Sequence, residues 1–334
     1  MTLTEGASRV VAYALYASFF YHKNMKRLPT LCPLLLLAPL FLLSACHDTG
    51  DDDDTWSTQP TEAPNANRND ASQEPSLSRL EFPHVKGDGS IVLIHTTNDL
   101  FGINYSVEWD CQKKSQRWSA YQLNSSTLQR NTSRANVGYP FDPQLPSQYY
   151  LSQDCFYSSG FDHGHICPSA DRLYSSEANE QTFYLTNMQP QYKAFNGSLS
   201  GGESYKNDWS PWFRLEGQVR SWANAATTEN LYVVKGGTIE DHQILPTLVK
   251  GEMRVPAYFF VALLLKNAQG YKAIGFWMEH KSSYEKQEPL SAYAVNISEL
   301  EQKTGIDFFC NLPDDTEQHI ETLARENVCR AWGL

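Results

Sequence analysis

The sequence has no excess of positive charge. Its 38 acidic and 27 basic side chains give a formal net charge of −11, and residues 81–334 keep 29 acidic and 21 basic side chains, a net charge of −8. A protein held on nucleic acid mainly by a broad basic surface needs Lys and Arg to release counterions from the phosphates. The net charge argues against that class of protein, but it does not exclude an enzyme that touches nucleic acid briefly through a local basic or metal-bearing groove.

The sequence also lacks an apolar run that is clearly long enough to span a membrane. The apolar segment at residues 30–45 is shorter than the ~20 residues that a spanning helix needs. Basic residues precede it, and the small residues Ser44 and Ala45 end it before Cys46. This pattern predicts a bacterial secretory signal. Residues 43–46 resemble a lipobox, so residues 1–46 are expected to be a signal peptide whose cleavage leaves a lipid on Cys46.

The alternative is ordinary signal cleavage beside an incidental cysteine. With the lipobox, we expect an exported protein anchored by Cys46 in a bacterial envelope, on the periplasmic side or at the cell surface. Residues 47–79 are polar, rich in proline and acidic at 51–54, so they predict a disordered linker. No comparable break divides residues 80–334, which predicts a single domain.

Five cysteines follow the linker, an odd number for an exported chain in which disulfides can persist. At least one is therefore expected to be free or unusually paired. Cys310 and Cys329 flank the last segment, and we expect them to form a disulfide there. Spacing does not pair the other three, which are Cys111, Cys155 and Cys167.

Runs rich in β-branched and aromatic residues predict strands that are separated mostly by turns. These runs are residues 90–95, 181–186, 231–236, 258–265 and 272–278. Helices are predicted at 211–226, where Pro211 suits the first turn and apolar residues recur at helical spacing, and at about 298–303. The fold class is therefore α+β, with a mostly antiparallel sheet flanked by helices.

Reactive side chains are densest in residues 159–172. His163, His165 and Cys167 would project from one face of an extended strand and could hold zinc. A polar loop and a catalytic base are equally good interpretations of this segment taken alone. Asp171 and Arg172 are expected to pair with each other.

A second segment, residues 186–196, decides between these interpretations. Its Asn187 and Asn196 offer neutral carbonyl oxygens that suit a hard cation such as Mg²⁺. Five segments, in their order along the chain, together resemble the DNA/RNA non-specific endonuclease family. They are residues 157–165, residues 187–196, the helix that starts near Trp212, strand 231–237 and the closing segment 305–313. These nucleases have the ββα-metal, or His-Me finger, fold.

The resemblance implies hydrolysis of phosphodiester bonds in DNA and RNA with little sequence preference. It makes His165 the general base that takes a proton from the attacking water. It makes Asn196 the direct protein ligand of one Mg²⁺, with Mn²⁺ or Ca²⁺ as alternatives. Glu216 would hold metal-bound waters, and Arg220, four residues on, would neutralise the phosphate; an ordinary surface pair between these two is the duller alternative.

The remaining residues of the motif receive supporting roles. Asn187 is expected to orient His165 or its loop unless it is only a turn residue, and Asp162 is expected to support the same loop. His163 stands where the family commonly has arginine, so we expect it to gain charge below neutral pH and partly replace that residue.

An inserted loop at residues 197–211 makes Asn207 an alternative metal ligand to Asn196. Two other functions stay open from the sequence. One is a nucleic-acid binding or uptake lipoprotein of the same fold with weak or no turnover, and the other is a surface adhesion protein with a structural zinc site.

Overall fold

The computed structural model describes residues 64–98, 102–197 and 210–334. None of the helices in these ranges has both the length and the apolar character to cross a membrane. The predicted signal peptide, Cys46, residues 47–63 of the predicted linker and Asn207 lie outside the described residues.

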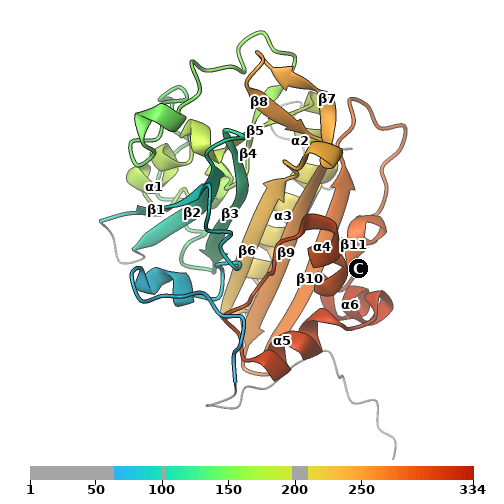
Figure 1. Cartoon of the computed structure of the whole chain (residues 1–334). Helices are drawn as coiled ribbons and strands as arrows, with labels where there is room; N and C mark the ends of the chain where they lie inside the picture. Colours follow the sequence, from blue (N-terminus) through green and yellow to red (C-terminus); the bar gives the residue numbers. More distant parts are fainter. Residues whose placement is uncertain (1–63, 99–101, 198–209) are drawn as a thin grey trace, which may run out of the picture. The chain divides into compact units, whose positions relative to one another are not determined.

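A seven-stranded antiparallel sheet forms the centre of the body (Figure 1). Its strands, in spatial order, are β1 (Ser90–Thr96), β2 (Ile103–Asp110), β3 (Ser115–Leu123), β6 (Asn230–Gly237), β9 (Tyr258–Asn267), β10 (Gly270–Glu279) and β11 (Ala294–Val295). Two small antiparallel sheets pair β4 (Asp162–His165) with β5 (Met188–Gln191) and β7 (Ile244–Val249) with β8 (Met253–Pro256). The α+β class and the antiparallel sheet are confirmed.

Helices cover both faces of this sheet. They are α1 (Ser176–Gln181), α2 (Lys193–Asn196), α3 (Pro211–Ala223), α4 (Ile297–Thr304), α5 (Asp314–Glu321) and α6 (Arg325–Trp332). One apolar cluster joins α3 and α6 to one face of the sheet, and a second joins α4 and α5 to the other. Residues along β9 alternate between the two clusters, which explains the continuous apolar run at 258–265.

The strand predicted at 181–186 is wrong. Helix α1 ends at Gln181, and a short 3-10 helix, η4 (Leu185–Asn187), follows it. Asn187 donates a hydrogen bond from Nδ2 to the carbonyl of Thr182, and the Thr182 hydroxyl donates to the carbonyl of Asn179. Side-chain hydrogen bonds of this kind compete with a strand ladder, so the buried Phe183 and Leu185 pack from a turn.

The predicted linker is too long, because the chain lies on the body from residue 64 onward. Nδ2 of Asn65 donates to the carbonyls of Cys310 and Leu312, and Nδ2 of Asn67 donates to Asp307 and Glu317. These asparagines look like linker residues by composition. Their side chains instead satisfy backbone and carboxylate groups of the C-terminal segment.

The predicted disulfide is also wrong, because Cys310 and Cys329 are free thiols, as are the other three described cysteines. The Cys310 thiol is buried, 3.8 Å from the carbonyl oxygen of Phe82, whereas Cys329 on α6 packs against the apolar cluster that contains α3. Burial raises the pKa of both thiols, Cys310 the more strongly. The thiols therefore belong to different parts of the core.

Candidate active site

A β-hairpin-like pair followed by a short helix builds the centre of the site. In the β4–β5 pair, His163 lies opposite Pro190 and His165 opposite Met188, and α2 begins two residues after β5. A Cβ atom on Gly164 would lie 2.4 Å from the Gln191 side chain, so the residue between the two histidines must be glycine for the strands to pack. This β4–β5–α2 unit places His165 and Asn196 on the same pocket.

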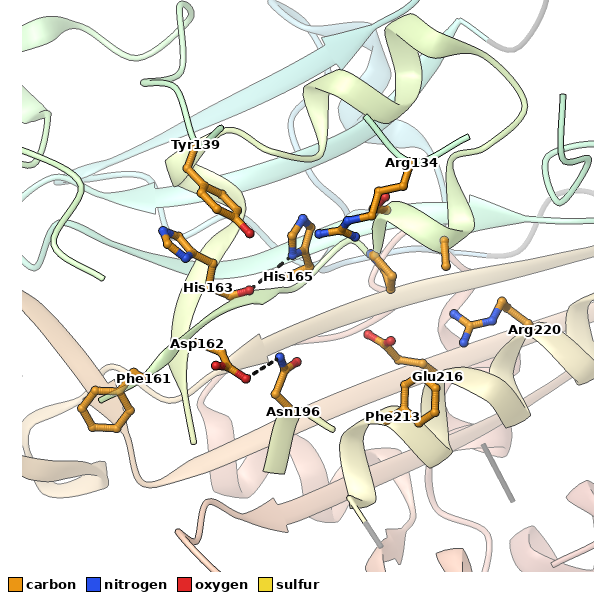
Figure 2. Close-up of a pocket in the computed structure, with 13 residues that line it drawn as sticks. Arg134, Tyr139, Phe161, Asp162, His163, His165, Asn196, Phe213, Glu216 and Arg220 are labelled. Atoms are coloured by element: carbon orange, nitrogen blue, oxygen red, sulfur yellow. Dashed lines mark hydrogen bonds between the residues drawn. The ribbon is translucent and has the colours of Figure 1, made fainter. Parts of the chain in front are cut away.

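The pocket has a volume of about 550 Å³ and collects side chains from distant parts of the chain. Figure 2 shows the carboxylates and the amide of Asp162, Asn196 and Glu216 along one side, with Arg134 and His165 above them and Arg220 at one end. The lining also includes the aromatic rings of Tyr139, Phe161 and Phe213. Oxygen ligands and cationic side chains therefore line the same cavity.

His165 is held so that its ring is neutral. Its Nδ1 lies 3.3 Å from the carbonyl oxygen of His163, and its Nε2 is buried with no partner among the described residues. A carbonyl oxygen only accepts, so this contact favours a proton on Nδ1 and a lone pair on Nε2. Burial, with a smaller contribution from the nearby Arg134 cation, lowers the pKa of His165 to about 3. The ring can therefore accept a proton at physiological pH.

Asn196 is oriented by a neighbour on β4. Its Nδ2 donates to Oδ2 of Asp162 at 3.2 Å, and Figure 2 shows the amide oxygen on the side toward Glu216. The next residue, Gly197, has φ +85, and a Cβ there would lie 2.6 Å from Cβ of Phe213. This close contact sets the end of α2 against the start of α3.

Glu216 and Arg220 lie one turn apart on α3, but each forms an ion pair outside the helix. Glu216 Oε1 accepts from Lys235 Nζ at 2.9 Å, and Arg220 Nη1 donates to Asp171 Oδ1 at 2.9 Å. The expected pairing of Asp171 with Arg172 is wrong. Buried Arg172 donates instead to three backbone carbonyls, those of Asn104, Asp171 and Gln122.

His163 belongs to the wall of the pocket. Its ring stacks between Tyr139, at 3.5 Å between centroids, and Phe156, at 4.4 Å. Its Nε2 lies 3.0 Å from both carboxylate oxygens of Asp154. Burial lowers the pKa of His163, although Asp154 opposes this shift. The hydrogen-bonding edge that would replace an arginine is therefore directed at Asp154.

Asn187 lies behind the pocket and is fully buried. Its side chain bonds both backbone groups of Cys167, with Nδ2 to the carbonyl at 2.9 Å and Oδ1 to the N–H at 2.8 Å. It thus fixes the chain just after His165 and does not line the pocket. Cys167 is buried as well, and burial raises the pKa of its thiol to about 12. No group of three His, Cys, Asp or Glu residues in the described ranges could hold a metal ion, so the structure gives the zinc hypothesis no support.

Sequence reasoning missed Arg134. It lies in the irregular segment between β3 and β4, with its guanidinium carbon 4.7 Å from the centroid of the Phe183 ring. The edge of His165 contacts the same ring, at 5.1 Å between centroids. No local pattern marks this arginine, because its neighbours are ordinary loop residues and only the fold brings it to His165.

The donor set of the pocket fits a hard divalent cation. Its available ligands are an amide oxygen of Asn196 and the nearby carboxylates of Asp162 and Glu216. Mg²⁺ takes few protein ligands, prefers oxygen and keeps several waters. Asn196 would hold such an ion directly, and Glu216 would bind its waters.

Comparisons with known proteins identify the family. A family model described as DNA/RNA non-specific endonuclease matches residues 93–315. A nuclease from Nostoc sp. strain PCC 7120 is 30% identical over 226 residues, which cover 65% of this chain and 75% of the relative. Nuclease C1 from Cunninghamella echinulata var. echinulata is 24% identical over 220 residues, 64% of this chain and 83% of the relative.

A solved structure shares the fold. A chain in the crystal structure of the EndoG/EndoGI complex aligns with a TM-score of 0.51 at 20% identity, covering 66% of this chain and 86% of that chain. The fold and the relatives define a phosphodiester hydrolase of the nuclease class. The chain belongs to the DNA/RNA non-specific endonuclease family, whose members are metal-dependent nucleases in general.

Proposed function

We propose that the chain is a Mg²⁺-dependent endonuclease that cuts both DNA and RNA with His165 as general base. The observation that supports this most strongly is a neutral, buried histidine in the same pocket as an oxygen ligand set and two arginines. A base must be unprotonated to take a proton from water, and His165 meets this condition above a pH of about 3.

The ion would be held directly by Asn196, with Mn²⁺ or Ca²⁺ as alternatives to Mg²⁺. Bound there, a divalent cation would stabilise the negative charge that develops on the phosphate and the leaving oxygen. The hydrogen bond from Asn196 to Asp162 supports this role, because it fixes which end of the amide faces the pocket.

The two arginines would bind the substrate's phosphates. Arg220 and Arg134 both line the pocket, and guanidinium groups form strong charge-assisted hydrogen bonds with phosphate oxygens. Neither contact depends on the identity of a base. This agrees with cleavage that has little sequence preference and with a net acidic protein whose basic groups are local.

A cleavage assay of the full-length chain tests this function. Supercoiled plasmid and single-stranded RNA are incubated with the wild type in Mg²⁺ or in EDTA, beside His165→Ala and Asn196→Ala. We expect both substrates to be cut only with metal, and loss of the base to slow cutting by about 10² to 10⁴. His242→Ala, which removes an exposed histidine remote from the pocket, is the matched control and should cut normally.

Each part of the proposal has its own negative outcome. A folded, Mg²⁺-supplied wild type that binds nucleic acid without cutting it would replace the enzyme with the binding lipoprotein. Activity that survives in Asn196→Ala but is lost in Asn207→Ala would move the metal ligand to the second asparagine.

We also propose that the enzyme is exported and held at a bacterial membrane by a lipid on Cys46. The basic, apolar and small-residue order before Cys46 supports this proposal. Growth with labelled palmitate should label the wild type and leave Cys46→Ser unlabelled and released from the membrane fraction. Equal membrane retention of both proteins would exclude the lipid anchor.

A further inference from the structure

A buried lysine lies directly beneath the pocket. Lys235 is on β6, between β3 and β9, and only 2% of its surface is exposed. Val233 and Leu231, two and four residues earlier, join the apolar cluster that packs against α3. Period two therefore turns Lys235 toward the same helix, at a position where an apolar side chain would be ordinary. A lysine is almost never buried this far unless it is paired.

Both contacts of the Lys235 ammonium group are with α3. Nζ donates to Glu216 Oε1 at 2.9 Å and lies 4.3 Å from the centroid of the Trp212 ring. Trp212 and Glu216 are four residues apart and so share one side of the helix. The lysine thus holds the helix and one of its pocket residues together.

A small cavity lies between this ion pair and Asp171, the counter-ion of Arg220. It has a volume of about 10 Å³, and its polar lining comes from Tyr121, Asp171, Glu216 and Lys235. Glu216 lines both this small cavity and the large pocket. Lys235, on the sheet, and Asp171, at the end of the short 3-10 helix Ser169–Asp171, are therefore the counter-ions of Glu216 and Arg220.

We propose that Lys235 is a positioning residue of the nuclease site. By occupying one oxygen of Glu216, it keeps this carboxylate directed at the metal-binding side of the pocket. It also prevents Glu216 from turning to Arg220 one turn away, an ion pair that would neutralise both groups. This inference rests on the proposed function, because Glu216 is its only route to the reaction.

A double-mutant cycle in the full-length chain tests the inference. Lys235→Met removes the charge with little change in volume, Glu216→Gln removes the proposed water-binding carboxylate, and the third variant carries both changes. Mn²⁺ binding by calorimetry and the Mg²⁺ concentration for half-maximal cleavage are measured for each. We expect Lys235→Met alone to weaken metal binding by about 10- to 100-fold, as loss of an outer partner does. When Lys235→Met is added to Glu216→Gln, the affinity for the metal should change by no more than about twofold further.

A second buried ion pair supplies the matched control. Arg117, 10% exposed, pairs with buried Glu108 at 3.3 Å and does not line the pocket. Arg117→Met should lower the unfolding temperature as Lys235→Met does, but leave Mn²⁺ binding and the Mg²⁺ concentration for half-maximal cleavage unchanged. If Lys235→Met does not fold, Lys235→Gln takes its place in the cycle, because it keeps a neutral donor for Glu216.

The outcomes separate this inference from the function beneath it. If Lys235→Met weakens metal binding equally in the wild type and in Glu216→Gln, Lys235 acts independently of Glu216. If it changes only the stability of the protein, Lys235 is a structural residue. Either outcome overturns the inference. A wild type that binds Mn²⁺ and cuts nothing would end the proposed function, while the binding cycle would still decide the role of Lys235. A wild type that binds no metal would overturn both.

Discussion

Nδ2 of Asn196 donates to Oδ2 of Asp162 at 3.2 Å, and this bond joins α2 to β4 along one side of the pocket. It fixes the Asn196 amide so that its oxygen, a better metal ligand than its nitrogen, faces into the pocket. Asp162 therefore contributes through Asn196 and need not touch an ion itself.

Substitutions at Asp162 should separate orientation from charge. Asp162→Ala frees the amide to flip, so we expect the Mg²⁺ concentration for half-maximal cleavage to rise about 10-fold. Asp162→Asn keeps an acceptor oxygen and should have the smaller effect. Equal damage from both variants would instead show that the carboxylate binds the ion directly.

Arg134 should affect both substrate binding and the titration of His165. Arg134→Ala removes a charge-assisted phosphate contact, so we expect KM to rise about 10-fold or more. The salt dependence of binding should become shallower by about one unit of slope. Because the Arg134 cation lowers the pKa of His165, its removal should raise that pKa and move the acidic limb of the pH–rate profile to higher pH.

Arg254→Ala is the control for Arg134, because Arg254 pairs with Asp241 and does not line the pocket. It should leave KM and the pH profile unchanged. An unchanged salt slope in Arg134→Ala would remove Arg134 from the phosphate contacts.

Asp171 should govern Arg220. The Asp171 carboxylate is 1% exposed and also accepts from the Tyr121 hydroxyl at 3.2 Å. Asp171→Asn leaves Arg220 without its counter-ion and free to turn toward Glu216, so we expect kcat/KM to fall about 10-fold, the equivalent of ~1.4 kcal/mol. Tyr121→Phe keeps the ion pair and should lower kcat/KM less; the reverse ranking of the two variants would contradict this role.

The side-chain carboxyl groups of the C-terminal segment, residues 301–321, should make the free energy of unfolding fall as pH rises. Burial and mutual repulsion raise the pKa of Glu301 to about 7 and of Glu317 to about 8 from a usual value of 4.5, and they also raise the pKa of Glu321 and Asp307. A carboxyl group with a raised folded-state pKa stabilises the fold fully below pH ~4.5. This contribution is then lost as pH rises through the folded-state pKa.

Thermal unfolding at pH 5 and pH 8 measures this loss. Glu317→Gln keeps an acceptor for Asn67 and cannot ionise. The difference in unfolding temperature between pH 5 and pH 8 should therefore shrink by about 2 to 4 °C for each kcal/mol of unfolding free energy that is recovered at pH 8. The exposed Glu326→Gln should not narrow it. A gap that stays as wide in Glu317→Gln as in the wild type would show that this carboxyl is already ionised at pH 5.

The sequence predicted the strands whose residues are buried on both faces, because continuous apolar runs such as 258–265 have one plausible structure. It failed at 181–186, where buried Phe183 and Leu185 look like strand residues but the asparagine that captures the Thr182 carbonyl lies beyond the run. Periodicity records which side chains are buried and does not record which hydrogen bonds the backbone makes.

The site shows the same division. Motif residues such as His165 and Asn196 could be selected because they are close in sequence and chemically distinctive. Arg134 and Lys235 could not be selected in this way. The neighbouring sequence does not show whether a loop arginine enters a pocket or stays in solvent, nor whether a strand lysine is buried in the sheet or exposed at its edge. Lys235 is buried because β6 pairs with β3 on one side and β9 on the other, and β6 begins more than 100 residues after the start of β3.

The asparagines that dock residues 65–69 on the C-terminal segment have a mechanical consequence. If the chain is tethered through its N-terminus as proposed, tension on the tether acts first on the hydrogen bond from Asp314 N–H to the Pro64 carbonyl and then on those of Asn65 and Asn67 to residues 307–317. None of these residues lines the pocket. A pull strong enough to peel this segment away would therefore break hydrogen bonds outside the pocket, and lengthen the tether, before it acts on the residues that line the pocket.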